Sequence, residues 1–434
     1  MQKLVIVTIG ALLLSFKSYA ADQQVETLDQ KLQKIISTYN LKPLEKMQPA
    51  PTEKIRLGAF LFHEIELSGP KNVACFNCHH PRFGTSDGMA FSIGEGGTGI
   101  GGFRKQGTGG LTKRHSPHLI NIGYTDIEFM FWDGRVHRDE QTGVLTTPEP
   151  ALNGKNPAAK DIVDVMTSSL AVQLIFPLVN ELEMKGDSGN DIADTANNLE
   201  AWEAIMKRLM AKTQYADQFK KAFPNTTKFN IGHVGEALAT FVGRNFNLVD
   251  TPYDRYLKGD VNAMSDEQKR GMLVFGGKGK CVECHNGRHL SNFEFYSVGV
   301  PQFAAVADSN PFDEGRYEVT KDPNDLYRFR TPPLRNISLT APFMHNGAFK
   351  TLEEVVDHFM NVTDSMANFD LSGVDMAPYN ETFVLDTDVV RNDKRVQSMP
   401  IQDMKKGTQL TQSEKLDLLK FLETALLDMR LQRR

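Results

Sequence analysis

Cys75-Phe-Asn-Cys78-His79 and Cys281-Val-Glu-Cys284-His285 decide the architecture of this chain. Both stretches are Cys-x-x-Cys-His pentads, and together they contain all 4 cysteines of the 434 residues. In this pentad two thiols attach a haem c covalently, and the histidine becomes the proximal ligand of the iron. A zinc ribbon would place its Cys-x-x-Cys units about 15–20 residues apart, and a thioredoxin-like pair would not need the histidine. The sequence therefore predicts two covalently bound haem c groups.

Residues 1–20 have the pattern of a secretory signal peptide. Lys3 precedes an apolar run from Leu4 to Phe16, and Ser18-Tyr-Ala20 forms a small-x-small cleavage site. The run is too short to cross a bilayer, and no other membrane span is expected. Because haem c is assembled on the outer side of the bacterial inner membrane, we expect a periplasmic protein.

The two pentads also set the expected domain organisation. One pentad lies in each half of the chain, which predicts an N-terminal haem domain over residues 21–250 and a C-terminal haem domain over 251–434. The formal net charge of −5 argues against nucleic acid as a partner.

Helical periodicity dominates the sequence. Apolar spacing predicts helices over residues 27–39, 199–223 and 234–246. Thr411-Gln-Ser-Glu414 is a capping box that opens the last helix. Its expected buried stripe consists of Leu416, Leu419, Leu422 and Leu426. Strand signals are few and short, and long loops are rich in Gly and Pro, so we predict a mostly-α fold.

Gly94-Glu-Gly-Gly-Thr-Gly99 matches the G-x-G-x-x-G pattern of dinucleotide-binding loops. No strand precedes it and no βαβ unit follows, so dinucleotide binding is not indicated. A glycine-rich loop close behind a haem motif either moves over the haem or lets backbone approach it closely.

Taken together, several motifs resemble those of the bacterial di-haem cytochrome c peroxidases and of the related MauG-type enzymes, which oxidise protein tryptophans. The resemblance runs from about Leu57 to the last helix. The motifs that carry it are Leu57–Phe62, Ser92–Gly96, Phe131–Arg135, Tyr256–Asp260, Pro333–Asn336 and Leu339–Phe343. The resemblance implies two cytochrome c-like domains with one haem each.

The resemblance also implies roles for particular residues. The first haem would be peroxidatic, the second would transfer electrons, and Trp132 would lie between them as a relay. Gln173, Pro177 and Glu183 match the peroxidatic pocket, where the glutamate would move a proton between the peroxide oxygens. An insertion of about residues 136–169 separates Trp132 from this set; one hypothesis is that it reshapes access to the pocket, but the sequence does not establish its role.

Glu95 departs from the peroxidase pattern. At this position the typical peroxidase has a histidine that ligates the peroxidatic iron at rest and leaves when the other haem is reduced. Glutamate is a poor ligand for low-spin iron by comparison. We therefore expect an open or weakly ligated first haem that meets peroxide without pre-reduction, as in the MauG type. If Glu95 is simply solvated, that expectation is unchanged.

Phe359 occupies the position of the distal ligand of the second haem, which is methionine in the peroxidases and tyrosine in the MauG type. Phenylalanine cannot bind iron, whereas its neighbours Met360 and His358 can after a small shift in helix register. A thioether raises the reduction potential and suits an electron-entry haem. Met360 is the first choice; His358, a later methionine (Met366 or Met376) or no ligand remain open.

The resemblance further implies a Ca²⁺ ion between the domains, held by the carbonyls of Thr340 and Pro342 and an asparagine side chain. His115 stands at the asparagine position and is a poor calcium ligand, so this site is an open expectation. No catalytic role is assigned to His345. The remaining histidines considered, expected at the surface or in the core, are His63, His118, His137 and His233.

The resulting hypothesis is a periplasmic di-haem peroxidase. Electrons would arrive from a small cytochrome c or cupredoxin at the haem on His285 and pass by way of Trp132 to the haem on His79, where hydrogen peroxide is reduced to water. The alternative is a MauG-like enzyme that uses peroxide to oxidise a protein or organic substrate. A plain electron-transfer cytochrome is disfavoured by the peroxidatic-pocket residues. A homodimer is common among such peroxidases, although nothing in the sequence demonstrates one.

Overall fold

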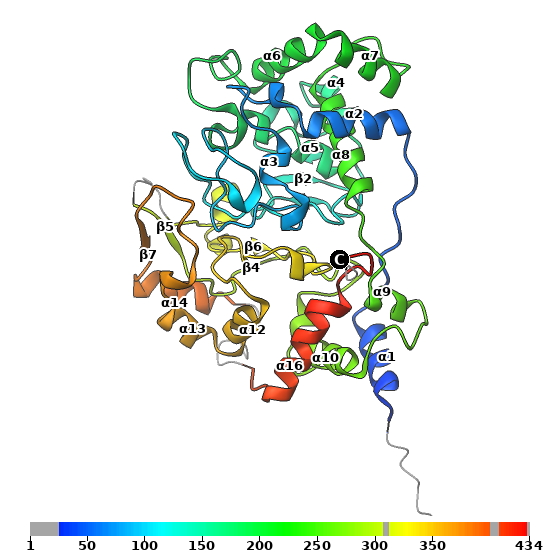
Figure 1. Ribbon diagram of the computed structural model, residues 1–434, viewed down its shortest axis with the longest axis vertical. Coiled ribbons are helices and arrows are strands. Elements are labelled where there is room, and N and C mark those ends of the chain that lie inside the picture. Colours follow the sequence, from blue (N-terminus) through cyan, green and yellow to red (C-terminus); the bar gives the residue numbers. More distant parts are fainter. Residues whose placement is uncertain (1–25, 307–311, 400–407, 432–434) are drawn as a thin grey trace, which may run out of the picture.

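The computed structural model of the chain describes residues 26–306, 312–399 and 408–431. Helices predominate and form an upper and a lower part (Figure 1), so the mostly-α prediction is confirmed. The motif 75–79 belongs to the upper part and the motif 281–285 to the lower part. Residues 1–20, predicted as a signal peptide, lie outside the described residues.

Two helices, α2 and α8, pack closely at the centre of the upper part. Gly58 of α2 permits this approach, because a Cβ there would collide with the α8 carbonyl of Ala237. The predicted helix 199–223 is divided at Lys212, where ψ of 112° ends the first segment. The helices of this part are α2 (Thr52–Phe62), α3 (Cys75–Cys78), α4 (Lys160–Val163), α5 (Ser169–Gln173), α6 (Asn198–Ala211), α7 (Thr213–Ala222) and α8 (Ile231–Asn245).

The first helix, α1 (Leu28–Thr38), belongs to the lower part although it precedes the upper part in the chain. Thr27 and Gln30 close its capping box, and Leu32 is buried in one core cluster with Met272 and Phe275 of α10. A boundary at residue 250 therefore does not separate the two cores. The other helices of this part are α9 (Pro252–Leu257), α10 (Asp266–Gly276), α12 (Leu352–Met360), α13 (Val362–Asn368), α14 (Val389–Gln397) and α16 (Gln412–Lys420).

The capping box predicted for the last helix is present in α16, where Thr411 and Glu414 bond each other's main chain. The predicted stripe is partly wrong, because Leu416 is 56% exposed and Leu418 is buried instead. The face that packs on α10 carries Leu418 and also Asp417, which accepts hydrogen bonds from Arg270 of α10.

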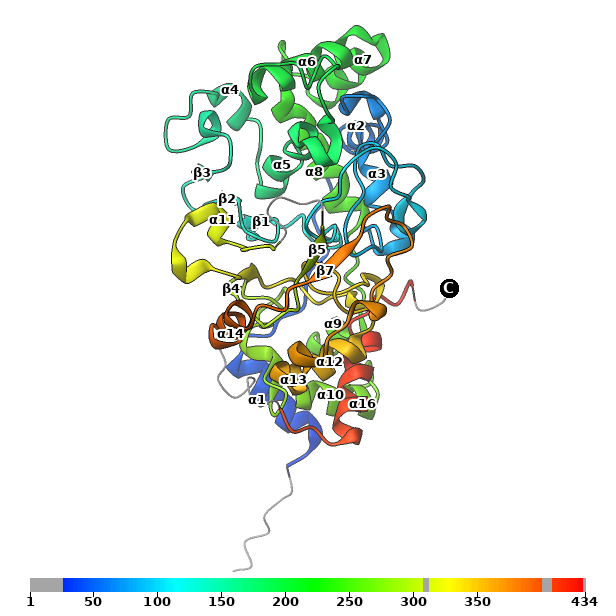
Figure 2. The same cartoon turned by 90° about the vertical axis from the view of Figure 1, so that its left-hand side faces the viewer.

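The strands are short, as predicted, and form three small antiparallel sheets. The upper sheet contains β1 (Phe129–Met130), β2 (Val136–Arg138) and β3 (Leu145–Thr146), and the lower pairs are β4 (Phe295–Tyr296) with β6 (Phe329–Arg330) and β5 (Phe303–Ala305) with β7 (Phe383–Leu385). Between β5 and β6 the chain forms α11 (Tyr317–Thr320), which lies beside β1 and β2 (Figure 2). None of the helices in the described ranges is long and apolar enough to cross a membrane.

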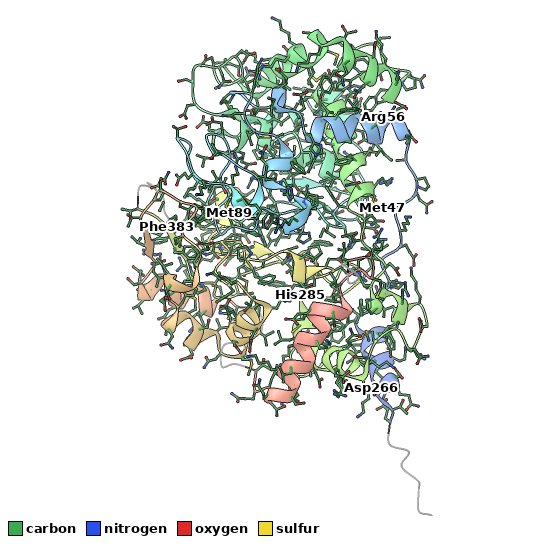
Figure 3. All side chains as sticks on the ribbon, in the orientation of Figure 1. Met47, Arg56, Met89, Asp266, His285 and Phe383 are labelled. Carbon is green, nitrogen blue, oxygen red and sulfur yellow. The ribbon has the colours of Figure 1, made fainter. Side chains whose placement is uncertain are left out.

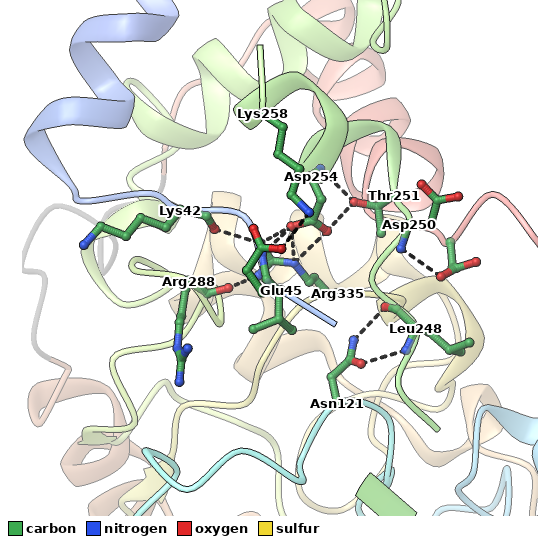
Figure 4. A network of polar contacts seen from close by, with 12 residues as sticks. Lys42, Glu45, Asn121, Leu248, Asp250, Thr251, Asp254, Lys258, Arg288 and Arg335 are labelled. Atoms are coloured by element: carbon green, nitrogen blue, oxygen red, sulfur yellow. Dashed lines mark hydrogen bonds and ion pairs between the residues drawn. The ribbon is translucent and has the colours of Figure 1, made fainter. Parts of the chain in front are cut away.

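A buried ion pair between Arg335 and Asp254 ties several segments together (Figure 4). The guanidinium donates to both carboxylate oxygens, with Nη2 at 2.7 Å from Oδ1, and each side chain is 1% exposed. Arg335 also donates to the carbonyls of Lys42 and Arg288, and the carboxylate accepts from the Leu44 N–H. The pair thereby connects α9, the segment after α1 and the segment behind the second haem motif.

We predict that Arg335→Ala lowers the free energy of unfolding by about 3–5 kcal/mol, because it leaves a buried carboxylate without its countercharge. Arg255→Ala is the matched control, since its pair with Asp250 has side chains that are 46% and 45% exposed. That loss should stay below about 1 kcal/mol. Urea unfolding followed by circular dichroism measures both, and equal losses would contradict the prediction.

Candidate active site

The first motif opens into a cavity in the upper part. Cys75 and Cys78 bracket the one-turn helix α3, and both line the cavity with His79. Nδ1 of His79 lies 3.0 Å from the Thr85 carbonyl oxygen, which fixes the ring and leaves Nε2 for a metal. Burial lowers the pKa of His79 to about 4, which keeps the imidazole neutral and able to ligate iron.

Four of the five residues singled out above for the peroxidatic site and its relay line this same cavity: Gln173, Pro177, Glu183 and Trp132. Gln173 ends α5, Pro177 opens the next helical turn, and Glu183 lies in a π-helical turn, Glu181–Lys185. Burial raises the pKa of Glu183, against a smaller lowering by the charge of Arg135. The cavity therefore brings a basic carboxylate to the side chains of the first motif.

Glu95, the fifth, is not brought into the cavity with the others. Its carboxylate accepts a hydrogen bond of 3.1 Å from the Asn72 side chain, and its main-chain N–H donates to the Glu183 carbonyl. The neighbouring Gly94 does line the cavity, and a Cβ there would collide with the carbonyl of Leu182. The glycine-rich loop thus permits close backbone approach, one of its two predicted roles.

The insertion reaches the first cavity. Thr146, Thr147 and Pro148 form part of its wall, so residues 136–169 shape the access to the site. The sequence contained no motif that would have indicated this contact.

The second motif lines a separate cavity in the lower part, and His285 lies near the middle of the molecule (Figure 3). Its arrangement repeats the first site, because Nδ1 of His285 lies 3.0 Å from the Leu290 carbonyl oxygen. Burial lowers the pKa of His285 to about 4 and raises that of Cys281 to about 12. Each motif thus has two cysteines and an oriented neutral histidine on one cavity wall, and this donor set fits a covalent haem c.

Among the described residues, methionine side chains line the second cavity at three positions. Met360, the first choice for the distal ligand, is among them, and Phe359 also lines the cavity; the ligand itself stays a prediction. Met344 and Met399 also line it, and sequence reasoning missed them because no motif marks them.

The alternative ligands are placed elsewhere. His358 has both ring nitrogens engaged, with Val298 O and Ser365 Oγ each at 2.9 Å, and it does not line the cavity. Met366 and Met376 pack in small apolar clusters outside the wall of this cavity.

Trp132 lies between the two cavities and lines both, together with His115 and Pro117. Its indole Nε1–H donates to the His115 carbonyl at 2.9 Å, and its own carbonyl accepts from the Arg330 N–H at 2.8 Å. The ring predicted to connect the two sites is thus held by main-chain hydrogen bonds.

A buried cluster of charges adjoins Trp132. Arg114 pairs with Asp133 and with Asp313, each at 2.5 Å, and so joins the upper part to the segment before α11. Burial would raise the pKa of Asp313, but the Arg114 guanidinium outweighs it and lowers that pKa to about 2. Arg114, Asp133 and the nearby Glu318 also line the first cavity.

The expected calcium donors Thr340 and Pro342 line the second cavity, as does His115. The His115 ring provides no oxygen, and its nitrogens lie 2.7 Å from Met89 O and 3.1 Å from Ser86 Oγ. Calcium prefers oxygen donors, so the side chain at this position does not fit the ion, and the calcium site stays a prediction. Within the described ranges, no group of three or more His, Cys, Asp or Glu residues could hold a metal.

Comparison with known proteins agrees with this geometry. The family model described as di-haem cytochrome c peroxidase matches residues 52–262. Cytochrome-c peroxidase IdrP1 of Pseudomonas sp. (strain SCT) is 31% identical over 342 residues, which cover 73% of this chain and 74% of that protein. The methylamine utilization protein MauG of Methylorubrum extorquens is 27% identical over 318 residues, which cover 73% of this chain and 71% of that protein. Cytochrome c551 peroxidase of Pseudomonas aeruginosa is 28% identical over 358 residues, which cover 82% of this chain and 85% of that protein.

Solved structures share the fold. A MauG-like protein associated with microbial copper homeostasis superposes with a TM-score of 0.59 at 24% identity, covering 91% of this chain and 95% of that one. The diheme peroxidase BthA from Burkholderia thailandensis E264 superposes with a TM-score of 0.55 at 19% identity, covering 89% of this chain and 90% of that one.

We predict that Met360 is the distal ligand of a haem c at the second site. Met360→Leu should then abolish the weak long-wavelength band of thioether-ligated ferric haem c and lower that haem's reduction potential, because a thioether raises it. Met344→Leu and Met399→Leu are matched controls from the same cavity wall and should keep the band. Loss of the band in either control alone would assign the ligand there.

Proposed function

Because this chain belongs to the di-haem cytochrome c peroxidase family, we propose that it reduces hydrogen peroxide to water in the periplasm with electrons from a small redox protein. Haem c, when bound, supplies a redox-active iron at each motif, one for peroxide at His79 and one for electron entry at His285. The first cavity supports this function best, because Gln173, Pro177 and Glu183 meet the first motif there.

Glu183 is assigned to proton transfer. Cleavage of the peroxide O–O bond needs a proton moved from one oxygen to the other, and a nearby carboxylate can accept and return it. Burial raises the pKa of Glu183, which makes the carboxylate a stronger base than an exposed glutamate. The Gln173 amide is suited to orient the peroxide, and Pro177 keeps that face of the cavity tight and dry.

Trp132 is assigned to electron relay between the sites. Its indole lines both cavities and is held by the 2.9 Å hydrogen bond to His115, so it offers an aromatic orbital at a fixed position between them. The donor would be a small cytochrome c or cupredoxin that reaches the second site. The periplasmic location rests on the sequence pattern of residues 1–20.

A second function is favoured by the position of Glu95. Its carboxylate is bonded to Asn72 rather than directed into the first cavity, which supports a first haem without the resting histidine ligand of the typical peroxidase. A first haem left open in this way would react with peroxide without pre-reduction. In that case the chain would spend the oxidising equivalents on a protein or organic substrate, and the insertion residues 146–148 would shape its access.

We predict a high-spin ferric electron paramagnetic resonance signal in the as-isolated diferric protein, and its loss on addition of one equivalent of hydrogen peroxide. The physical reason is the missing side-chain ligand at residue 95. Two low-spin signals that peroxide leaves unchanged would contradict an open first site. Turnover of reduced cytochrome c separates the peroxidase from the substrate-oxidising enzyme.

We predict that Glu183→Gln slows the reaction with peroxide about 10²–10⁴-fold, because the amide cannot accept a proton. In the wild type the rate should fall as pH falls through the Glu183 pKa, which is raised by burial and so lies above that of an exposed glutamate. Stopped-flow mixing over a pH series measures both effects. Glu95→Gln is the control and should react at the wild-type rate; an unaltered pH profile in Glu183→Gln would refute the assignment.

A further inference from the structure

Arg330 is buried between the two sites with part of its guanidinium unused. The residue is 8% exposed, and its Nε–H donates to the Phe131 carbonyl at 3.1 Å. The guanidinium also lies over the Phe293 ring, 5.5 Å from the centroid. Among the residues that the structure describes, its buried Nη1 has no hydrogen-bond partner, and the side chain lines the second cavity.

Within residues 26–306, 312–399 and 408–431, no carboxylate forms an ion pair with Arg330. The acid whose charge acts on it is Asp133, which is already paired with Arg114 and with Arg135. Burial lowers the pKa of Arg330 to about 10, as expected for a cation removed from water. Buried cations are ordinarily paired and fully hydrogen-bonded, so this guanidinium requires an anion from the cavity.

His118 contributes a second buried polar atom to the same cavity wall. Its Nδ1 is without a hydrogen-bond partner within the described part of the chain. Burial lowers the pKa of His118 to about 4, although hydrogen bonding to the backbone of Pro333 and Ile120 acts in the opposite direction, so the ring is neutral and has a single N–H to donate. A neutral donor beside a guanidinium suits a single carboxylate.

We propose that Arg330 and His118 bind a propionate carboxylate of the haem c attached through Cys281 and Cys284. Haem c carries two such carboxylates, and the cavity that receives it contains Arg330, His118 and both thiols. The assignment rests on the second haem of the proposed function, and it does not depend on what the enzyme oxidises.

Arg330 also contacts the segment that contains Trp132, the residue assigned to electron relay. The Arg330 N–H bonds the Trp132 carbonyl at 2.8 Å, and its side chain bonds the preceding carbonyl, that of Phe131. A propionate bound by Nη1 is therefore linked through one residue to the backbone of Trp132. Arg330 is a positioning residue that holds the second haem and the relay together, and its charge favours the reduced form of that haem.

The test is the reduction potential of each haem in purified holoprotein, measured by spectroelectrochemistry for Arg330→Gln and Arg330→Lys. We expect Arg330→Gln to shift the potential of the second haem to a more negative value, with little change at the first, and Arg330→Lys to retain most of the wild-type value. Arg288→Gln is the matched control, because Arg288 follows the same motif but pairs with Asp126, is 39% exposed and does not line the cavity.

An unchanged second potential in Arg330→Gln, an equal shift at both haems, or an equal shift in Arg288→Gln would overturn the assignment. If Arg330→Gln does not accumulate, resonance Raman spectra of the wild type and Arg330→Lys decide. The propionate bending band must change when an ammonium replaces the guanidinium, and an identical band would refute the contact. A shifted potential without peroxidase activity would sink the proposed function and leave this contact standing.

Discussion

The hydrogen bond from the Trp132 indole to the His115 carbonyl lies where the walls of both cavities meet. The His115 ring bonds Met89 and Ser86 on one side, and its main-chain N–H donates to the His345 carbonyl at 2.7 Å on the other. The bond from the His115 N–H to the His345 carbonyl therefore links the upper part to the lower part beside Trp132.

Local sequence signals predicted individual helices well, whereas contacts between distant segments could not be predicted from them. The capping boxes at Thr27 and Thr411 depend on side chains three residues away, so the sequence contains the whole signal. The packing of α1 on α10 joins segments more than 200 residues apart, and no local pattern encodes it. The sequence also predicts Leu416 on the buried face of α16, but this side chain is exposed, because the neighbouring helix determines which face is buried.

The candidate site divides in the same way, between features that motifs predict and features that long-range packing determines. The resemblance placed Gln173 and Glu183 together, and the turns after α5 bring both to one cavity. The side chain of Glu95 could not be placed from the sequence, because its partner Asn72 lies 23 residues away along the chain and no motif links the two. Met399 is brought to the second cavity by tertiary packing from beyond α14, a contact without a sequence motif.

Two buried arginines differ in whether the protein itself supplies a carboxylate for their charge. Arg335 has a protein carboxylate, Asp254, on its guanidinium, so its charge is balanced by the fold alone. Arg330 is bonded to carbonyls but has no carboxylate of its own among the described residues. A buried charge without a countercharge destabilises a folded structure. The free Nη1 of Arg330 in the second cavity is thus the observation that favours an anionic group of the cofactor at this position.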